Sequence, residues 1–419
     1  MPTIILGNRR NLSVSDDNSN GDTIILGNGA DDTVSAASSQ YDTILLGNGA
    51  NDAVSAAASQ YDTIILGNGA GDVVNALGKV GDPALPGSLY NTITLGNGRG
   101  DTVNLFGASN DAITLGNGAG DTVSATPNLT DFSSRYDTIT LGNGTADIVS
   151  LDNSQGDTIT LGNGVRNTVD ITGFFPSSGD TIILGNGAAD SVNVGEGSDN
   201  RIIVGNGDGD SIDLGGGSFG AQGDTIIVGD GQADAVTIGH GSNNNIALGN
   251  GDHDVVNNQG GSHNTITLGN GAGDVVNDAG SSDTITLGNG ADTITAGADS
   301  LIMVGNGADT ITAGADSTIT LGNGADTVTA VSSLINGGHG HDTFMLTGSF
   351  GEDTITNFSP AHDNIVLAQA VFGNFGAMQH DIAQVGANTV ITDPQNSANM
   401  ITLTGVKTSS LHASDFQFA

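Results

Sequence analysis

The sequence predicts an all-β protein, a parallel β-solenoid (β-roll) of about sixteen coils with a C-terminal β-rich capping domain. Two observations predict this fold class. The phrase Gly-Asn-Gly occurs fourteen times, most often 20 residues apart, and a short apolar segment with period-two alternation precedes and follows each copy. Such self-similarity is typical of a solenoid, in which each coil buries its apolar face only by stacking on its neighbours.

One coil consists of two short strands and two turns. A strand over 22–26 leads into Gly27-Asn28-Gly29, a second strand covers 32–36, and a looser turn returns to Asp42. Alternation predicts that Ile24 and Leu26 point inward, as do Val34 and Ala36. Helical periodicity is absent from residues 1–336, so we expect a solenoid domain over 1–336 and a capping domain over 337–419.

Composition limits the functional classes. The 67 glycines are expected to supply turn positions with positive φ. The net charge of -38, carried almost wholly by Asp, argues against binding to nucleic acid or to an anionic membrane surface. No apolar run reaches the length of a membrane span. The chain has no Cys, and no ordinary signal peptide is expected at its start.

Twelve successive Gly-x-Gly turns carry an acidic or amide residue at a fixed offset. In-register stacking would place these side chains in one column, which is repulsive unless it is screened, paired or bridged by cations. Alternatively, the central Asn residues form an amide ladder and the Asp residues cap the turns, with no metal required. Both interpretations remain open for Asp32, Asp52, Asp72, Asp101, Asp121, Asp147, Asn167, Asp190, Asp210, Asp234, Asp254 and Asp274.

The opposite edge of the predicted solenoid carries the length changes and the aromatic residues. Longer connections fall at 77–91, 125–137, 172–180 and 215–224. Aromatic loops on a rigid scaffold favour a contact surface for self-association, a cell surface or a polysaccharide. The rings could equally seal the ends of the core. The aromatic residues are Tyr41, Tyr61, Tyr90, Phe106, Phe132, Tyr136, Phe174, Phe175 and Phe219.

From residue 287 the coils shorten, and each turn loses one residue before its Asp. The turns that lead to Asp292, Asp309 and Asp326 then fit the nonapeptide G-G-x-G-x-D-x-U-x except at its first position, and residues 337–345 fit it fully. Gly-Ala-Asp299 and Gly-Ala-Asp316 place further acidic turns on the other edge.

This nonapeptide resembles that of the RTX, or haemolysin-type calcium-binding, family. The resemblance implies that Ca²⁺ is held by turn carbonyls and by the sixth-position Asp of stacked turns. Because the first twelve turns carry an extra residue, the implied sites are not transferred to them. The implied ligands are the carboxylates of Asp342, Asp326, Asp309 and Asp292, the carbonyls of Gly337, Gly338, His339 and Gly340, and next Asp299 and Asp316.

The C-terminal block is predicted to close the roll. Strands are expected at 344–346, 351–358, 363–367, 390–392 and 400–403, with a short helix inside 367–384. The chain ends Asp415-Phe416-Gln417-Phe418-Ala419. This end resembles the C-terminal domain of RTX proteins exported by type I systems, and it implies secretion through an uncleaved signal.

No catalytic constellation is found, so we expect a non-enzymatic protein. The eight His residues lack zinc-like spacing. The leading hypothesis is a secreted, calcium-binding β-roll with a structural, adhesive or matrix role, whose folding is promoted by external Ca²⁺. A surface-layer or filament subunit that assembles by end-to-end coil stacking is a second hypothesis. A solenoid polysaccharide lyase or epimerase is a third.

Overall fold

The computed structural model describes residues 3–77, 88–125, 134–172, 177–215 and 220–419. The chain is an all-β parallel solenoid of about 17 turns with a small antiparallel C-terminal region, so the predicted fold class is confirmed. It forms two compact units, residues 1–228 and residues 229–419. Each coil contributes one strand to sheet A, before the Gly-Asn-Gly turn, and one strand to sheet B, after it.

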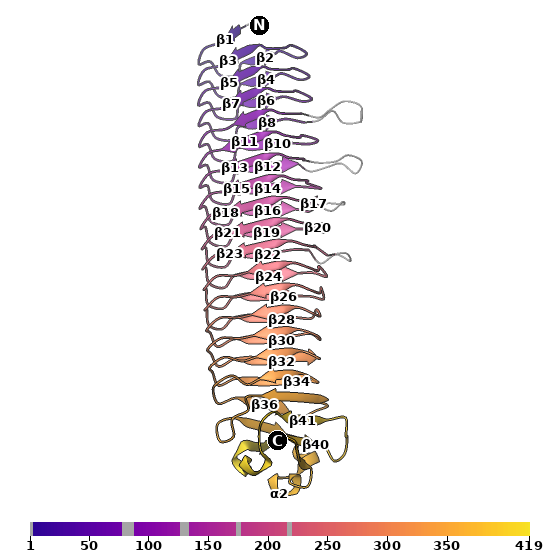
Figure 1. Cartoon of the computed structure of the whole chain (residues 1–419). Coiled ribbons are helices and arrows are strands. Elements are labelled where there is room, and N and C mark those ends of the chain that lie inside the picture. The colour runs from indigo at the N-terminus through magenta and orange to yellow at the C-terminus, as the bar shows by residue number, and fades with distance from the viewer. Residues whose placement is uncertain (1–2, 78–87, 126–133, 173–176, 216–219) are drawn as a thin grey trace. The chain divides into compact units, whose positions relative to one another are not determined.

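In residues 1–228 the two sheets are built from short parallel strands paired in register. Thr23 pairs with Thr43 in sheet A, and Val34 pairs with Val54 in sheet B. Figure 1 shows the sheet B strands of this unit lying one above another. Sheet A contains β1 (Thr3–Ile5), β3 (Thr23–Ile25), β5 (Thr43–Leu45), β7 (Thr63–Ile65), β9 (Thr92–Thr94), β11 (Ala112–Leu115), β13 (Thr138–Leu141), β15 (Thr158–Leu161), β18 (Thr181–Leu184), β21 (Arg201–Val204) and β23 (Thr225–Val228). Sheet B contains β2 (Ser13–Ser15), β4 (Thr33–Ser35), β6 (Ala53–Ser55), β8 (Val73–Asn75), β10 (Thr102–Asn104), β12 (Thr122–Ala125), β14 (Ile148–Leu151), β16 (Thr168–Ile171), β19 (Ser191–Val194) and β22 (Ser211–Asp213), and β17 (Ser177–Ser178) pairs with β20 (Gly197–Ser198).

Residues 229–419 repeat the same arrangement. Parallel pairing continues past residue 336, because β36 pairs with β34 and β38 pairs with β36. Sheet A contains β25 (Asn245–Ala247), β27 (Thr265–Thr267), β29 (Thr284–Thr286), β31 (Leu301–Met303), β33 (Thr318–Thr320), β35 (Leu334–Asn336), β37 (Glu352–Thr356) and β41 (Met400–Leu403). Sheet B contains β24 (Ala235–Ile238), β26 (Val255–Asn258), β28 (Val275–Asp278), β30 (Thr293–Ala296), β32 (Thr310–Ala315), β34 (Thr327–Val331), β36 (Thr343–Leu346), β38 (Asn364–Leu367) and β42 (Phe416–Phe418).

The C-terminal region adds the antiparallel part. Strand β40 (Asn388–Thr392) pairs antiparallel with β39 (Ile382–Val385) and with β41. The predicted helical segment contains two single-turn helices, α1 (Gln369–Phe372) and α2 (Phe375–Met378). Two short 3₁₀ turns, η1 (Thr408–Ser410) and η2 (Ala413–Asp415), precede β42. The chain end is folded, because β42 pairs with β38 and Asp415 is fully buried.

The core is a thin double row of aliphatic side chains. Ile24 and Leu26 are buried on sheet A, and Val34 and Ala36 are buried on sheet B, as the alternation predicts. The in-register pairing places Ile24 beside Ile44 of the next coil. Each coil therefore buries a few side chains of its own and shares the rest of its apolar contacts with its neighbours.

The glycines of the Gly-Asn-Gly turns do not have positive φ, whereas other turn glycines do, such as Gly71 at 73° and Gly100 at 71°. The last glycine of the turn is required by close approach instead: a Cβ at Gly49 would collide with the carbonyl oxygen of Gly29, and a Cβ at Gly69 would collide with that of Gly49. Positive φ occurs at the residue before each long turn's Asp, such as Asp31 at 62° and Asn51 at 59°. This residue is the one that the shortened coils lack.

Candidate functional site

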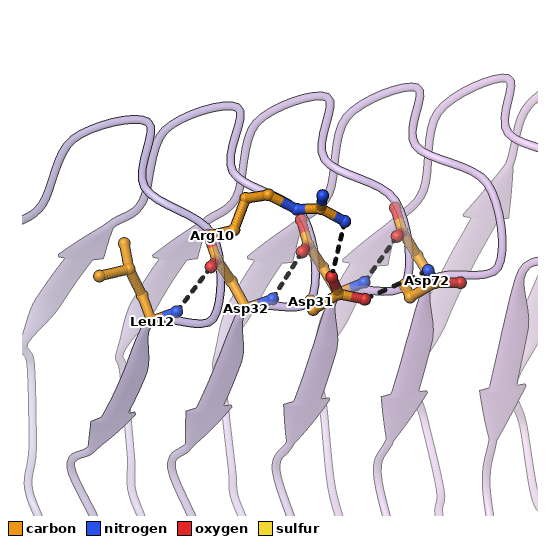
Figure 2. Close-up of polar contacts among 7 residues, drawn as sticks. Arg10, Leu12, Asp31, Asp32 and Asp72 are labelled. Atoms are coloured by element: carbon orange, nitrogen blue, oxygen red, sulfur yellow. Dashed lines mark hydrogen bonds and ion pairs between the residues drawn. The ribbon is translucent and has the colours of Figure 1, made fainter.

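A ladder of carboxylates runs through the turns that precede sheet B. Within each unit, the backbone N–H of a ladder residue donates to Oδ1 of the equivalent residue in the next coil, as Asp32 does to Asp52 at 2.9 Å. Figure 2 shows the start of the ladder, where the Leu12 N–H donates to Oδ1 of Asp32 at 2.8 Å. Asn167 occupies one ladder position: its amide Oδ1 accepts the Asp147 N–H, and its own backbone N–H donates to Oδ1 of Asp190. We call this column the first ladder.

The four predicted calcium-binding carboxylates are consecutive members of the first ladder in residues 229–419. The N–H of Asp292 donates to Oδ1 of Asp309 at 2.9 Å, that of Asp309 to Asp326 at 2.9 Å, and that of Asp326 to Asp342 at 3.1 Å. All four side chains are at most 2% exposed. Within the described residues, the Oδ2 of each of them is buried and has no hydrogen-bond partner. One oxygen of each carboxylate therefore supports the fold, and the other remains available to a proton or a cation.

Burial changes the acidity of these groups. Desolvation, together with the charge of the neighbouring carboxylates, raises the pKa of Asp309 and of Asp342 to about 7 and that of Asp292 to about 6. The backbone N–H that each Oδ1 accepts opposes the rise. The protonated and the charged forms of Asp309 and Asp342 are therefore close in free energy near neutral pH, and a cation would favour the charged form.

The full nonapeptide lies beside a hollow of about 590 Å³. Gly338, His339 and Gly340 line this hollow together with Asp363, which sequence reasoning did not select. Asp363 continues the first ladder, because its Oδ1 accepts the Asp342 N–H at 3.1 Å. Its Oδ2 accepts from the Ser359 N–H at 2.7 Å, so Asp363 closes the row of unpaired oxygens. Gly337 donates its N–H to the Thr356 carbonyl and is not part of this lining.

Asp299 and Asp316 do not join the first ladder. They lie on the other edge, are exposed, and have positive φ values of 59° and 62°. The buried position that follows each of them is a serine, Ser300 or Ser317. Because their carboxylates face solvent, these two residues are separated from the column of Asp292 and Asp309.

A second ladder, which sequence reasoning did not identify, precedes sheet A. The N–H of Asp22 donates to Oδ1 of Asp42 at 2.8 Å, and Asp42 repeats the bond to Asp62 at 2.9 Å. Desolvation raises the pKa of Asp111 and of Asp157, further along this ladder, to about 8. The signal in the sequence is the Asp or Asn before the first residue of most sheet A strands, which inspection of the Gly-Asn-Gly turns alone does not reveal.

The central Asn residues form a third, exposed ladder, as the amide interpretation predicts. The N–H of Asn48 donates to Oδ1 of Asn28, and that of Asn68 to Oδ1 of Asn48, both at 2.8 Å. These bonds run toward the preceding coil, whereas the bonds of the first ladder run toward the next coil. The turn edge is therefore hydrogen-bonded in both directions without any metal.

The carboxylate oxygens of the first ladder are suitable ligands for a hard cation, but side chains alone would not complete its coordination. In the part of the chain that the structure describes, no three Asp, Glu or His side chains converge to hold a metal ion. A cation at the first ladder would take one or two carboxylate oxygens and complete its shell from backbone carbonyls or water. Ca²⁺ accepts such an all-oxygen, irregular set.

An exposed aromatic cluster lies on the edge that carries the second ladder. Tyr41 stacks on Tyr61 with ring centroids 5.0 Å apart, and Tyr61 stacks on Tyr90 at 5.1 Å. All three have positive φ near 60° and are 43–60% exposed, so these rings do not seal the core. Tyr136 is exposed too, and Phe106 is half-buried. Phe132, Phe174, Phe175 and Phe219 lie outside the described residues.

Comparison with known proteins does not assign the chain to a family. No protein-family model matches the chain, and no similar curated protein was found. Within the described ranges, no helix is long and apolar enough to cross a membrane. The structure shows a parallel β-solenoid in which a buried ladder carboxylate recurs about every ten residues.

Proposed function

We propose that this protein is a secreted, calcium-binding β-roll with a structural or adhesive role, whose folding is promoted by external Ca²⁺. The observation that carries the proposal is the row of buried Oδ2 atoms of Asp292, Asp309, Asp326 and Asp342, which lack hydrogen-bond partners among the described residues. Buried carboxylates at coil spacing repel one another, and a bound cation offsets this repulsion.

The residues that would hold Ca²⁺ are these four carboxylates and the backbone carbonyls of the adjacent glycine turns. We place the proposed Ca²⁺ sites in residues 287–345 and not in the earlier coils. The turns of this region are one residue shorter, because they lack the residue of positive φ before the Asp, and they match the RTX nonapeptide. Asp299 and Asp316 are left out of the proposed ligand set because they are exposed on the other edge.

Calcium would act on folding through mass action. Ions that bind the folded ladder but not the unfolded chain stabilise the fold in proportion to the logarithm of the ion concentration. A chain with a net charge of -38 would be less stable at low cytosolic Ca²⁺ than outside the cell, where bound Ca²⁺ would stabilise the fold. The resemblance of the C-terminal residues to a type I export signal supports the same location, and we propose no catalytic activity.

The second candidate role is adhesion or self-association through the exposed column of Tyr41, Tyr61 and Tyr90. Their positive φ is unfavourable for an aromatic residue, and strained, exposed residues are typical of contact surfaces. A polysaccharide, a cell surface or another copy of the chain would meet the ring edges and hydroxyl groups of this column.

The test is a Ca²⁺ titration of chelator-treated protein followed by far-UV circular dichroism, with Mg²⁺ as the control and ion number measured by calorimetry. Binding of a few ions, with a rise in melting temperature that Asp309→Asn and Asp326→Asn reduce, supports the proposal. A melting temperature that does not change up to millimolar Ca²⁺ would contradict it.

A further inference from the structure

The core of residues 229–419 is interrupted by polar side chains at one point. The fourth residue of the sheet B strands β24 to β38 points inward and is usually apolar, as in Ile238 of β24 and Ala296 of β30. Between them, β26 ends with Asn258 and β28 ends with Asp278, which pair directly with each other. Both side chains are 2% exposed. A buried carboxylate in an aliphatic row is destabilising unless its charge is compensated.

A second buried carboxylate lies against this pair. The Asn258 Nδ2 donates to Oδ1 of Asp278 at 2.7 Å and contacts Oδ2 of Asp283 at 3.3 Å, so one amide bridges the two acids. The same Nδ2 reaches the Gly261 carbonyl oxygen at 3.4 Å. Gly280 completes the enclosure, since a Cβ there would collide with the Gly261 carbonyl oxygen and with Oδ2 of Asp283.

The charges of this cluster are not balanced by the protein. Asp278 Oδ1 accepts from Asn258 and from the Gly280 N–H at 2.8 Å, but its Oδ2 is buried without a hydrogen-bond partner in the described part of the chain. Neither Asp278 nor Asp283 has an ion pair among the described residues. Two buried carboxylates that share one amide donor and have no cationic side chain beside them within the described ranges require a shared proton or a cation.

Two members of the cluster, Asn258 and Asp278, line a hollow. A cavity of about 520 Å³ is lined by Asn257, Asn258, Gln259, Asn277 and Asp278, among others.

We infer that Asp278 and Asp283, beside Asn258 and the Gly261 carbonyl, bind one divalent cation of the calcium class. This site is separate from the first ladder and has neither the glycine turn nor the nonapeptide spacing. The donors are carboxylate and carbonyl oxygens, which Ca²⁺ prefers. The bound ion neutralises two buried charges at the one place where the aliphatic row is broken, and it would fix β26 to β28.

The experiment measures the number of Ca²⁺ ions bound per full-length chain by titration calorimetry, after chelator treatment. Asp278→Asn and Asp283→Asn each remove one carboxylate, and Asn is compatible with the second ladder because Asn244 and Asn264 occupy it naturally. Asp252→Asn is the matched control, since it removes an exposed carboxylate from the turn before β26. Both test variants should bind one ion fewer than the wild type and the control, while their metal-free forms melt at the same or a higher temperature.

An unchanged ion number in both variants, together with a higher melting temperature of the metal-free protein, would show that the pair holds only a shared proton and would overturn the inference. A wild type that binds no Ca²⁺ would overturn it together with the proposed function. Loss of one ion in Asp278→Asn but none in Asp309→Asn would support this site and contradict the first ladder. The opposite result would support the first ladder and contradict this site.

Discussion

The backbone N–H of Asp309 donates to Oδ1 of Asp326 in the next coil at 2.9 Å, while Oδ2 of Asp326 is buried with no hydrogen-bond partner among the described residues. In this carboxylate, Oδ1 supports the fold and Oδ2 is free to bind a proton or a cation. A substitution can remove one function and keep the other, which allows the fold and the proposed ion site to be tested separately.

Two substitutions of Asp309 should distinguish the structural role of Oδ1 from the charge of the carboxylate. Asp309→Asn keeps an oxygen that accepts the Asp292 N–H and removes a buried charge, so the metal-free protein should be as stable as the wild type or more so. Asp309→Ala leaves that N–H buried and unpaired and should lower the free energy of unfolding by about 1–3 kcal/mol. Urea unfolding in chelator measures both. Asp316→Asn, at an exposed site, is the control and should change stability by less than about 0.5 kcal/mol.

Stability without metal should fall as pH rises. The folded-state pKa values of Asp309, Asp342, Asp111 and Asp157 are raised from 3.8 to about 7 or 8. Because the folded pKa exceeds the unfolded one, the stabilising contribution is complete below about pH 4 and is lost as pH rises through 6 to 8. Thermal unfolding in chelator between pH 4 and pH 8 checks this. Saturating Ca²⁺ should weaken the trend, and a metal-free protein that becomes more stable above pH 6 would contradict it.

Two glycines of one turn, Gly118 and Gly120, should differ in how much their substitution destabilises the protein. Gly118→Ala should be strongly destabilising, by about 2 kcal/mol or more, because its Cβ would collide with the Gly98 carbonyl oxygen of the preceding coil. Gly120 has a φ of 74° with open space around it, so Gly120→Asn should cost less than about 1 kcal/mol. Chemical unfolding of the two variants gives the comparison. Equal effects would show that φ, and not coil spacing, selects these glycines.

The tyrosine column should contribute little to stability. Tyr61→Asn removes stacking worth about 0.5–1.5 kcal/mol but places a residue that tolerates positive φ, as Asn110 does at the equivalent position. The two effects oppose each other, so the free energy of unfolding should change by less than about 1 kcal/mol. Denaturant unfolding measures it. A loss above 2 kcal/mol would indicate that the column is a structural element and not a contact surface.

The period of the sequence was sufficient to predict the solenoid, the inward positions of Ile24 and Val34, and the stacking of Asp292 on Asp309. These features depend only on alternation and on repeats being in register. The second ladder, the role of Gly49 and the exposure of Asp299 depend on which atoms meet between coils, and residue spacing does not specify that. Asp278 carried a readable signal, since it shares the inward parity of Ile238, but a single acid among many Asp residues did not stand out.

Each bond of the first ladder joins a residue to its own counterpart in the following coil, most often 20 residues away in the sequence and 17 in the shortened coils. Removing or duplicating one whole coil would therefore leave every donor facing an equivalent acceptor. The chain length can change in steps of one coil while this pattern of ladder bonds is kept. Folding can likewise begin at any coil and spread to its neighbours, because few contacts need distant parts of the chain to meet.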